Sequence, residues 1–122
     1  MRGRVDVDLD AILQLRLRGP GKSAHTVIAV IDTGYSGWLT LPPRMISALQ
    51  LPKVGPGVAE LADGTIASFD LYKGAVFWHG RWLPIDIDEA TTDPLIGMAL
   101  LEGCELNIRV KRGGNVTVQP LQ

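Results

Sequence analysis

The segment Val27-Ile28-Ala29-Val30-Ile31-Asp32-Thr33-Gly34 is a run of apolar residues followed by Asp-Thr-Gly. The apolar run predicts a buried strand, and Asp32 comes where that strand ends and the chain must turn. A carboxylate at such a place costs free energy unless it is hydrogen-bonded or used. Asp32 is therefore either a functional group or a turn residue that caps its own backbone. The motif occurs once in 122 residues.

Length and composition limit the classes of protein to consider. We expect residues 1–122 to form a single domain with one core. The net charge of −1 gives no reason to expect a nucleic acid or an anionic membrane as partner. No apolar run is long enough to span a bilayer, and the first residues contain no apolar signal-peptide core. With Cys104 as the sole cysteine, we expect a cytoplasmic protein without internal disulfides, whose thiol is buried as a small apolar group.

Short stretches of alternating apolar and polar residues occupy most of the chain, separated by Gly and Pro. This pattern is typical of half-buried strands, and long helical periodicity is missing. We predict strands over 5–9, 13–17, 26–31, 38–41, 59–61, 65–69, 71–78, 81–87, 106–110 and 116–118. Short helices are predicted over 44–49 and 98–102, a loop over 53–58, and a turn over 90–93. The sum is a mostly β fold, either a barrel or a sandwich.

Several familiar site patterns are incomplete. The turn Gly19-Pro20-Gly21-Lys22-Ser23 ends like a phosphate-binding loop, but Arg16 stands where that loop needs its first glycine. His25 and His79 have no partner at metal-ligand spacing. The acidic residues between 86 and 93 lack the regular ligand alternation of a calcium loop. We therefore expect no metal and no cofactor.

Three elements occur in an informative order along the chain. Asp32-Thr33-Gly34 follows the buried strand, and Ala62-Asp63-Gly64 forms a predicted hairpin tip about thirty residues later, since Asp-Gly is a strong hairpin signal. Leu95-Ile96-Gly97 then precedes a short helix. From about Leu13 to Ile108 the chain resembles the retropepsin-like aspartic proteases, and it is most similar to their small single-domain bacterial and archaeal members.

The resemblance implies a fold and a set of roles. The fold would be the closed acid-protease barrel with one or two short helices. Asp32 would be catalytic, Thr33 would brace the loop across a subunit interface, and Gly34 would let the backbone pass close to the carboxylates. Ala62, Asp63 and Gly64 would form the flap over a bound peptide, and the segment 95–97 would pack beside the catalytic loop.

Tyr35 departs from the pattern of the family. Retroviral members carry Ala after the Asp-Thr-Gly motif, and pepsin-like members carry Ser or Thr, whose hydroxyl can reach the catalytic carboxylate. The larger Tyr35 ring is expected to pack under the loop or to line a subsite instead.

The chemistry implied by the resemblance needs two carboxyl groups. Neighbouring like charges separate the two proton affinities, so that one group is ionised while the other holds a proton. A chain with one such motif supplies one carboxylate, so an active enzyme would be a homodimer with Asp32 and its symmetry mate on the axis. The predicted function is therefore an aspartic endopeptidase that cleaves peptides or unfolded protein. The alternative is a catalytically weak module of the same fold that dimerises or binds peptides.

Overall fold

The structure is a computed structural model that describes residues 1–21, 23–60 and 62–122 and, of Ala59 and Ala67, the backbone alone. Over these residues the chain forms ten strands and two short helices. The strands are β1 (Arg2–Val5), β2 (Ala11–Arg18), β3 (His25–Ile31), β4 (Leu39–Leu41), β5 (Lys53–Glu60), β6 (Ile66–Trp78), β7 (Arg81–Glu89), β8 (Leu95–Ile96), β9 (Cys104–Ile108) and β10 (Asn115–Pro120). The helices are α1 (Pro43–Leu49) and α2 (Met98–Leu101).

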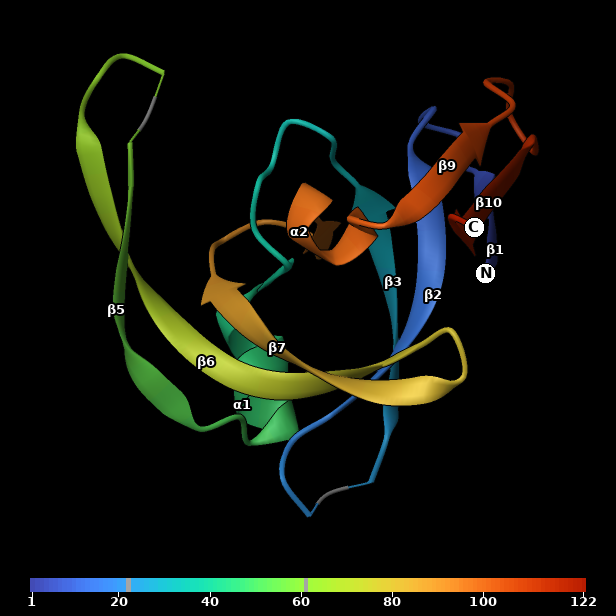
Figure 1. Cartoon of the computed structure of the whole chain (residues 1–122). Coiled ribbons are helices and arrows are strands. Elements are labelled where there is room, and N and C mark those ends of the chain that lie inside the picture. The colour runs from blue at the N-terminus through green and yellow to red at the C-terminus, as the bar shows by residue number, and fades with distance from the viewer. Residues whose placement is uncertain (22, 61) are drawn as a thin grey trace.

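Six of the strands close into a barrel (Figure 1). The order β6-β7-β4-β8-β3-β2 returns to β6 through the pairs Leu17 with Val76 and Arg18 with Ala75. The pairs β3–β8 and β4–β7 are parallel, and the other neighbours in the barrel are antiparallel. The expectation of a mostly β, closed retropepsin-like barrel with one or two short helices is confirmed.

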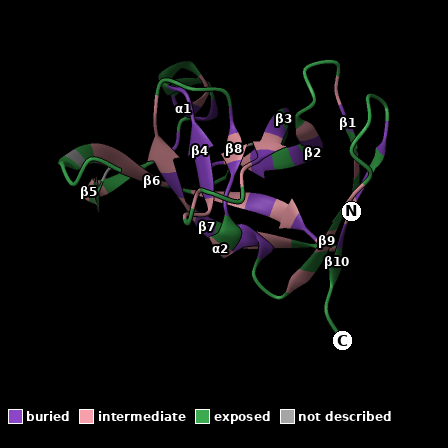
Figure 2. Cartoon of the chain, turned by 90° about the horizontal axis from the view of Figure 1, so that it is seen from above, coloured by how far each residue is buried: buried purple, intermediate pink, exposed green. Residues whose placement is uncertain are grey.

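The remaining strands extend the barrel at two places. β1 pairs with β2 and with β10, and β10 pairs with β9, so both chain ends lie at this side of the molecule (Figure 1). β5 pairs with β6 and forms the outer edge at the other end of the sheet order. The β5–β6 hairpin reaches well beyond the barrel (Figures 1 and 2).

The core follows the alternation seen in the sequence. Leu13, Leu15 and Leu17 of β2 are at most 1% exposed, whereas the residues between them, Gln14 and Arg16, are exposed. Figure 2 shows the buried residues gathered in the central strands and the exposed ones in the outer loops. Alternate residues of a strand point to opposite faces, so the period-two pattern fixes which face of each strand is inside.

The prediction of a strand over 5–9 is wrong beyond Val5. Val7 is 75% exposed and lies in the turn between β1 and β2. The Asp6 carboxylate accepts hydrogen bonds from the backbone N–H groups of Asp8 and Asp10, at 3.0 and 2.9 Å. Leu9 takes a left-handed backbone conformation with φ of 64°. Side chains of Asp readily bond their own backbone in this way, and the turn displaces the strand.

The prediction of a loop over 53–58 is also wrong, because these residues belong to β5. Pro56 is opposite Asp70, and a register shift lies between Lys53 and Gly55. An edge strand tolerates proline because one side of its backbone needs no partner in the sheet. The predicted end of this strand at Leu61 lies outside the described residues, as does Lys22 in the predicted turn 19–23.

The helix predicted over 44–49 and the hairpin turn predicted at His79-Gly80 are both found in the structure. α1 begins at Pro43 and ends at Leu49, and Gln50 caps it in a left-handed conformation. The β6–β7 hairpin turns at His79 and Gly80, both with positive φ. Neither described helix is long and apolar enough to cross a membrane.

Candidate active site

The loop 32–38, which we call the Asp32 loop, connects β3 to β4. The backbone N–H of Asp32 donates to the carbonyl oxygen of Ile96 at 2.9 Å, which extends the β3–β8 pairing by one residue. Asp32 is therefore held at the rim of the barrel by main-chain bonds on the strand that precedes it.

The two oxygens of the Asp32 carboxylate have different surroundings. Oδ1 accepts the backbone N–H of Gly34 at 2.9 Å, while Oδ2 has no hydrogen-bond partner among the described residues. The side chain is partly buried. One oxygen thus fixes the orientation of the group, as the turn-cap interpretation predicts, and the other is free to bind or exchange a proton.

The segment after β8 braces the Asp32 loop from one side. The N–H groups of Gly97, Met98 and Ala99 donate to the carbonyls of Trp38, Tyr35 and Gly37, at 3.1, 2.8 and 3.1 Å. A Cβ atom on Gly97 would lie 2.1 Å from the Gly37 carbonyl oxygen, so only glycine allows this approach. Residues 95–97 lie beside the Asp32 loop, as predicted.

Tyr35 ties the Asp32 loop to β7. Its hydroxyl donates to Asp88 Oδ2 at 2.5 Å, and its ring lies against Gly37 and Gly97, where a Cβ atom would collide with it. Of the two alternatives predicted for this side chain, packing within the loop is the one observed.

Burial sets the electrostatics of this contact. It raises the pKa of the Tyr35 phenol well above its usual range, and the hydrogen bond to Asp88 raises it further. Burial also raises the pKa of Asp88, to which the nearby charge of Asp86 adds, whereas the hydrogen bond from Tyr35 lowers it. The net effect on Asp88 is a raised pKa.

Thr33 and Gly34 stand at the exposed tip of the Asp32 loop. The Thr33 hydroxyl makes no hydrogen bond within the part of the chain that the structure describes. Thr33 borders a groove of about 520 Å³ between the loop, α2 and β9, where Met98 is 47% exposed. An added Cβ at Gly34 would lie 3.3 Å from Asp32 Oδ1, which is a crowded approach.

The predicted hairpin tip Ala62-Asp63-Gly64 connects β5 to β6, as expected. Asp63 Oδ1 accepts bonds from the N–H and the hydroxyl of Thr65, at 3.0 and 2.6 Å, and these bonds lower the pKa of Asp63. Gly64 has φ of 86°. Among the described residues, no hydrogen bond or ion pair joins this tip to the Asp32 loop, although both rise toward the same end of the molecule (Figure 1).

The register of the sheet places Phe69 and Leu71 on the same face as Asp88. Leu71 is opposite Asp88, so the two side chains share one face, and Asp88 contacts Tyr35 of the loop. Phe69 lies two residues from Leu71 on β6 and shares that face. Phe69 and Leu71 are thus candidates for contact with a molecule held above the loop.

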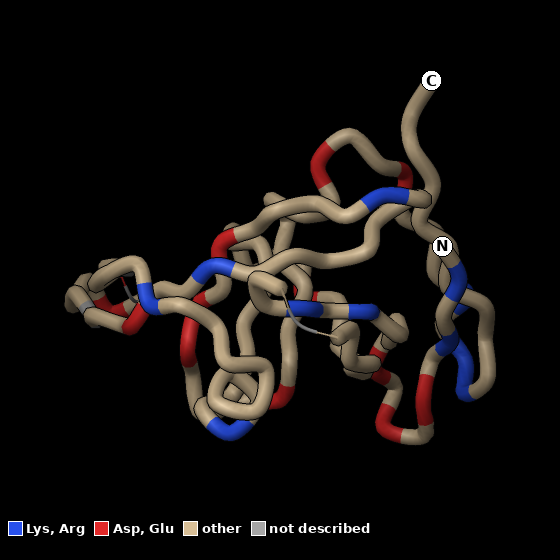
Figure 3. The backbone as a smooth tube through the Cα atoms, turned by 90° about the horizontal axis from the view of Figure 1, so that it is seen from below, with Lys and Arg blue, Asp and Glu red and all other residues tan. Residues whose placement is uncertain are grey.

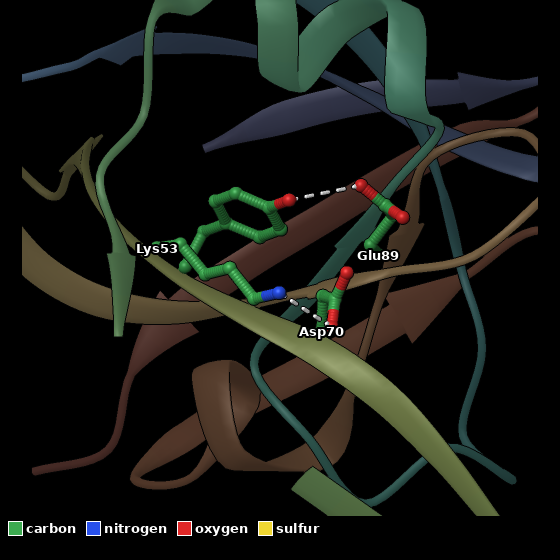
Figure 4. Close-up of polar contacts among 4 residues, drawn as sticks. Lys53, Asp70 and Glu89 are labelled. Carbon is green, nitrogen blue, oxygen red and sulfur yellow. Dashed lines mark hydrogen bonds and ion pairs between the residues drawn. The ribbon is translucent and has the colours of Figure 1, made fainter. Parts of the chain in front are cut away.

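Polar contacts secure the opposite face of the hairpin at its base. Lys53 Nζ lies 3.1 Å from Asp70 Oδ1, and the Tyr72 hydroxyl donates to Glu89 Oε2 at 3.2 Å (Figure 4). These side chains are exposed or partly exposed, so the ion pair contributes little to stability. They hold the root of the hairpin and leave its tip free of the barrel.

Comparison with known proteins yields a structural likeness alone. No family model and no curated protein matches the sequence. The crystal structure of a retropepsin-like aspartic protease from Rickettsia conorii is similar over 100% of this chain and 91% of that chain, with a TM-score of 0.59 and 14% identity. This chain has the retropepsin-like fold. In that fold, the Asp32 loop and the β5–β6 hairpin lie on one side of a six-stranded barrel.

Two side-chain contacts were missed by the sequence analysis. One is the bond from Tyr35 to Asp88, 53 residues away. The other joins Cys104 Sγ and His79 Nε2 at 3.6 Å. Cys104 is partly buried, so the prediction that its thiol is buried as a small apolar group is wrong. No local pattern signals either pair, because both depend on which strands become neighbours.

The described residues offer no cluster of three or more His, Cys, Asp or Glu side chains arranged to hold a metal ion. The braced Asp32 loop instead presents a single carboxylate. Alone, such a group can accept or donate one proton.

Proposed function

We propose that this protein is an aspartic endopeptidase that acts as a homodimer, with one Asp32 from each subunit in a shared site. The observation that carries the proposal is the state of Asp32: one oxygen is fixed by Gly34, the other is free, and the loop is braced on the retropepsin-like barrel. The fold likeness to an aspartic protease supports the same assignment.

The chemistry follows from bringing two Asp32 carboxyls together. Their mutual repulsion keeps one ionised while the other is protonated, and the pair titrates as a unit. The ionised member takes a proton from a water molecule as that water attacks the scissile carbonyl carbon. The protonated member donates to the carbonyl oxygen, where negative charge develops. The tetrahedral intermediate then collapses as its C–N bond breaks. The amine nitrogen takes the proton that the first carboxyl gained from water, and the second carboxyl recovers its proton from a hydroxyl of the intermediate, which leaves as the carboxylic acid product.

The neighbours of Asp32 fit supporting roles in such a dimer. Thr33 presents a hydroxyl that is free of partners among the described residues, and it is thus available to a second subunit. Gly34 gives the close backbone approach that orients the carboxylate. The partly exposed Met98 beside Thr33 adds apolar surface that a subunit contact would bury.

The β5–β6 hairpin is suited to cover a peptide. Ala62, Asp63 and Gly64 would form the tip that closes over it, and the outer edge of β5 offers backbone groups to an extended chain. Phe69 and Leu71 share a face with Asp88, which contacts Tyr35 of the loop, and they would contact substrate side chains. The same edge also suits the alternative, a peptide-binding module with weak or no catalysis.

The test is cleavage of a random peptide mixture from acidic to neutral pH, with products identified by mass spectrometry. Asp32→Asn keeps an oxygen for the Gly34 N–H but removes the acid, so we expect activity to fall by at least about a thousandfold. Asp8→Asn, an equal charge change on an exposed turn, should leave cleavage unchanged. Cleavage that persists in Asp32→Asn would overturn the proposal. Peptide binding without cleavage by the wild type would favour the binding module.

A further inference from the structure

The outside of the barrel, where β2 meets β6 and β7, carries a cluster of basic and aromatic side chains, of which Arg16 is exposed and the others are partly exposed. Arg16, Arg18, Phe77 and Trp82, which we call the basic aromatic face, lie on the outward side of these strands. Their neighbours Leu17 and Val76 point inward and are at most 1% exposed.

The two guanidinium groups are held against aromatic rings. The Cζ atom of Arg18 lies 4.1 Å from the centre of the Trp82 ring, and that of Arg16 lies 5.6 Å from the same ring and 5.4 Å from Phe77. Phe77 and Trp82 pack edge to face at 5.4 Å. Contact with a ring restrains a guanidinium group while its N–H donors are left free to take a carboxylate in bidentate fashion.

Neither arginine is neutralised within the described part of the chain. The ion pairs found there are Lys53 with Asp70 and Lys73 with Asp86. Asp86 shares the outward face with Arg18, but its carboxylate is engaged by Lys73 at 2.5 Å. Figure 3 shows basic positions along this underside of the molecule. Two unpaired cations around one indole make a local positive potential on a chain of net charge −1.

A groove of about 550 Å³, lined in part by Arg18, adjoins the basic aromatic face. Arg18 lines one side of the groove as an unpaired cation, Lys73 lines it while paired with Asp86, and Pro20, Ala75 and Pro84 provide apolar surface. This combination fits an apolar side chain flanked by carboxylates better than it fits a bare inorganic anion, since an anion would leave the apolar surface in contact with water.

We propose that the basic aromatic face and its groove bind acidic peptide segments in which carboxylates flank an apolar residue. β2 is paired on both edges here, with β3 and β6, so recognition must come from side chains and not from strand addition. Arg18 lies six residues along β2 from Ile12, which pairs with Val30 near the Asp32 loop, a separation of about 20 Å. The site is thus distinct from Asp32 and does not depend on the proposed catalysis.

The test is fluorescence anisotropy with a labelled peptide that contains Asp-Val-Asp-Leu-Asp, checked for integrity by mass spectrometry. Saturable binding to the wild-type chain is expected. The double variant Arg16→Gln, Arg18→Gln should bind at least about tenfold more weakly, because each charged hydrogen bond is worth that much or more. Arg2→Gln, Arg4→Gln makes the same charge change on the exposed residues of β1 and should bind like the wild type.

Further variants and peptides distinguish specific binding at the basic aromatic face from general attraction between opposite charges. Arg16→Lys, Arg18→Lys keeps the charge but loses the planar guanidinium groups and their bidentate hydrogen bonding, and it should also bind at least about tenfold more weakly. Equal binding by this lysine variant, or equal loss in the β1 control, would overturn the proposal. The same holds if an Asn-Val-Asn-Leu-Asn peptide binds as well as the acidic one. Tighter binding of a single-stranded oligonucleotide would assign the face to nucleic acid and overturn the peptide assignment.

Discussion

The Asp32 loop and the β5–β6 hairpin rise toward the same end of the barrel but are held in opposite ways. Backbone bonds to residues 96–99, at the end of β8 and the start of α2, and the contact of Tyr35 with Asp88 of β7 fix the loop on two sides. The hairpin tip is stabilised by its own residues, Asp63 and Thr65. A group that performs chemistry must be held in place, whereas a segment that admits a substrate must be able to move.

The largest effect is expected when one glycine in each region is replaced by alanine. Gly97→Ala places a Cβ 2.1 Å from the Gly37 carbonyl, so we expect the free energy of unfolding to fall by about 3 kcal/mol or more. In Gly64→Ala the added Cβ has no atom within 4 Å, so only the positive φ of this residue is unfavourable. We expect the free energy of unfolding to fall by about 1 kcal/mol. Urea unfolding measures both. Equal losses would contradict the contrast between a braced loop and a free tip.

Removing the Tyr35 hydroxyl tests the tie between the loop and β7. Tyr35→Phe leaves Asp88 without its donor, and we expect a loss of about 1–2 kcal/mol in the free energy of unfolding. Tyr72→Phe removes the more exposed bond to Glu89 at the base of the hairpin and should cost less. A larger loss for Tyr72→Phe than for Tyr35→Phe would show that the hairpin base, and not the loop, is the better anchored region.

Asp88 should also make stability depend on pH. Because burial raises its pKa above the unfolded value, the folded state binds the proton more tightly than the unfolded state does. Its contribution is therefore fully present at pH below the unfolded pKa and is lost as pH rises through the folded pKa. The stability of Asp88→Asn relative to the wild type should therefore increase as the pH rises through this range. Thermal unfolding at a series of pH values measures it. A difference that shrinks with rising pH would contradict this assignment.

The smallest effect is expected at the hairpin tip. Asp63→Ala removes both bonds to Thr65, so amide hydrogen exchange should become faster at the tip. Exchange at Met98 and Ala99, whose N–H groups bond to the Asp32 loop, should not change. Faster exchange at these two amides would show that the two regions are mechanically coupled.

The elements that the sequence predicted best are those governed by local rules. Alternation located β2, the apolar run located β3, Asp-Gly located the hairpin tip, and Pro43 located the start of α1. The segment 53–58 was misjudged because its Gly and Pro are typical of loops, whereas the edge position of β5 tolerates them. Val7 was misjudged because the Asp6 carboxylate makes a turn that outweighs the apolar alternation.

The candidate site was predictable in part for the same reason. The Asp-Thr-Gly motif placed Asp32 at a strand end, and the short spacing to Gly34 permits the bond that orients it. The role of Asp88 was not predictable, since only the parallel pairing of β4 with β7 and the fold of the loop bring it to Tyr35. Contacts made across a barrel depend on topology, which the local pattern does not encode.

The most direct test of the shared site mixes wild-type and Asp32→Asn subunits at constant total concentration and allows them to exchange. If each site needs an Asp32 from both subunits, peptidase activity follows the square of the wild-type fraction, so an equal mixture retains about one quarter of full activity. Activity that instead falls in direct proportion to the wild-type fraction would mean that one Asp32 suffices, and it would contradict the account.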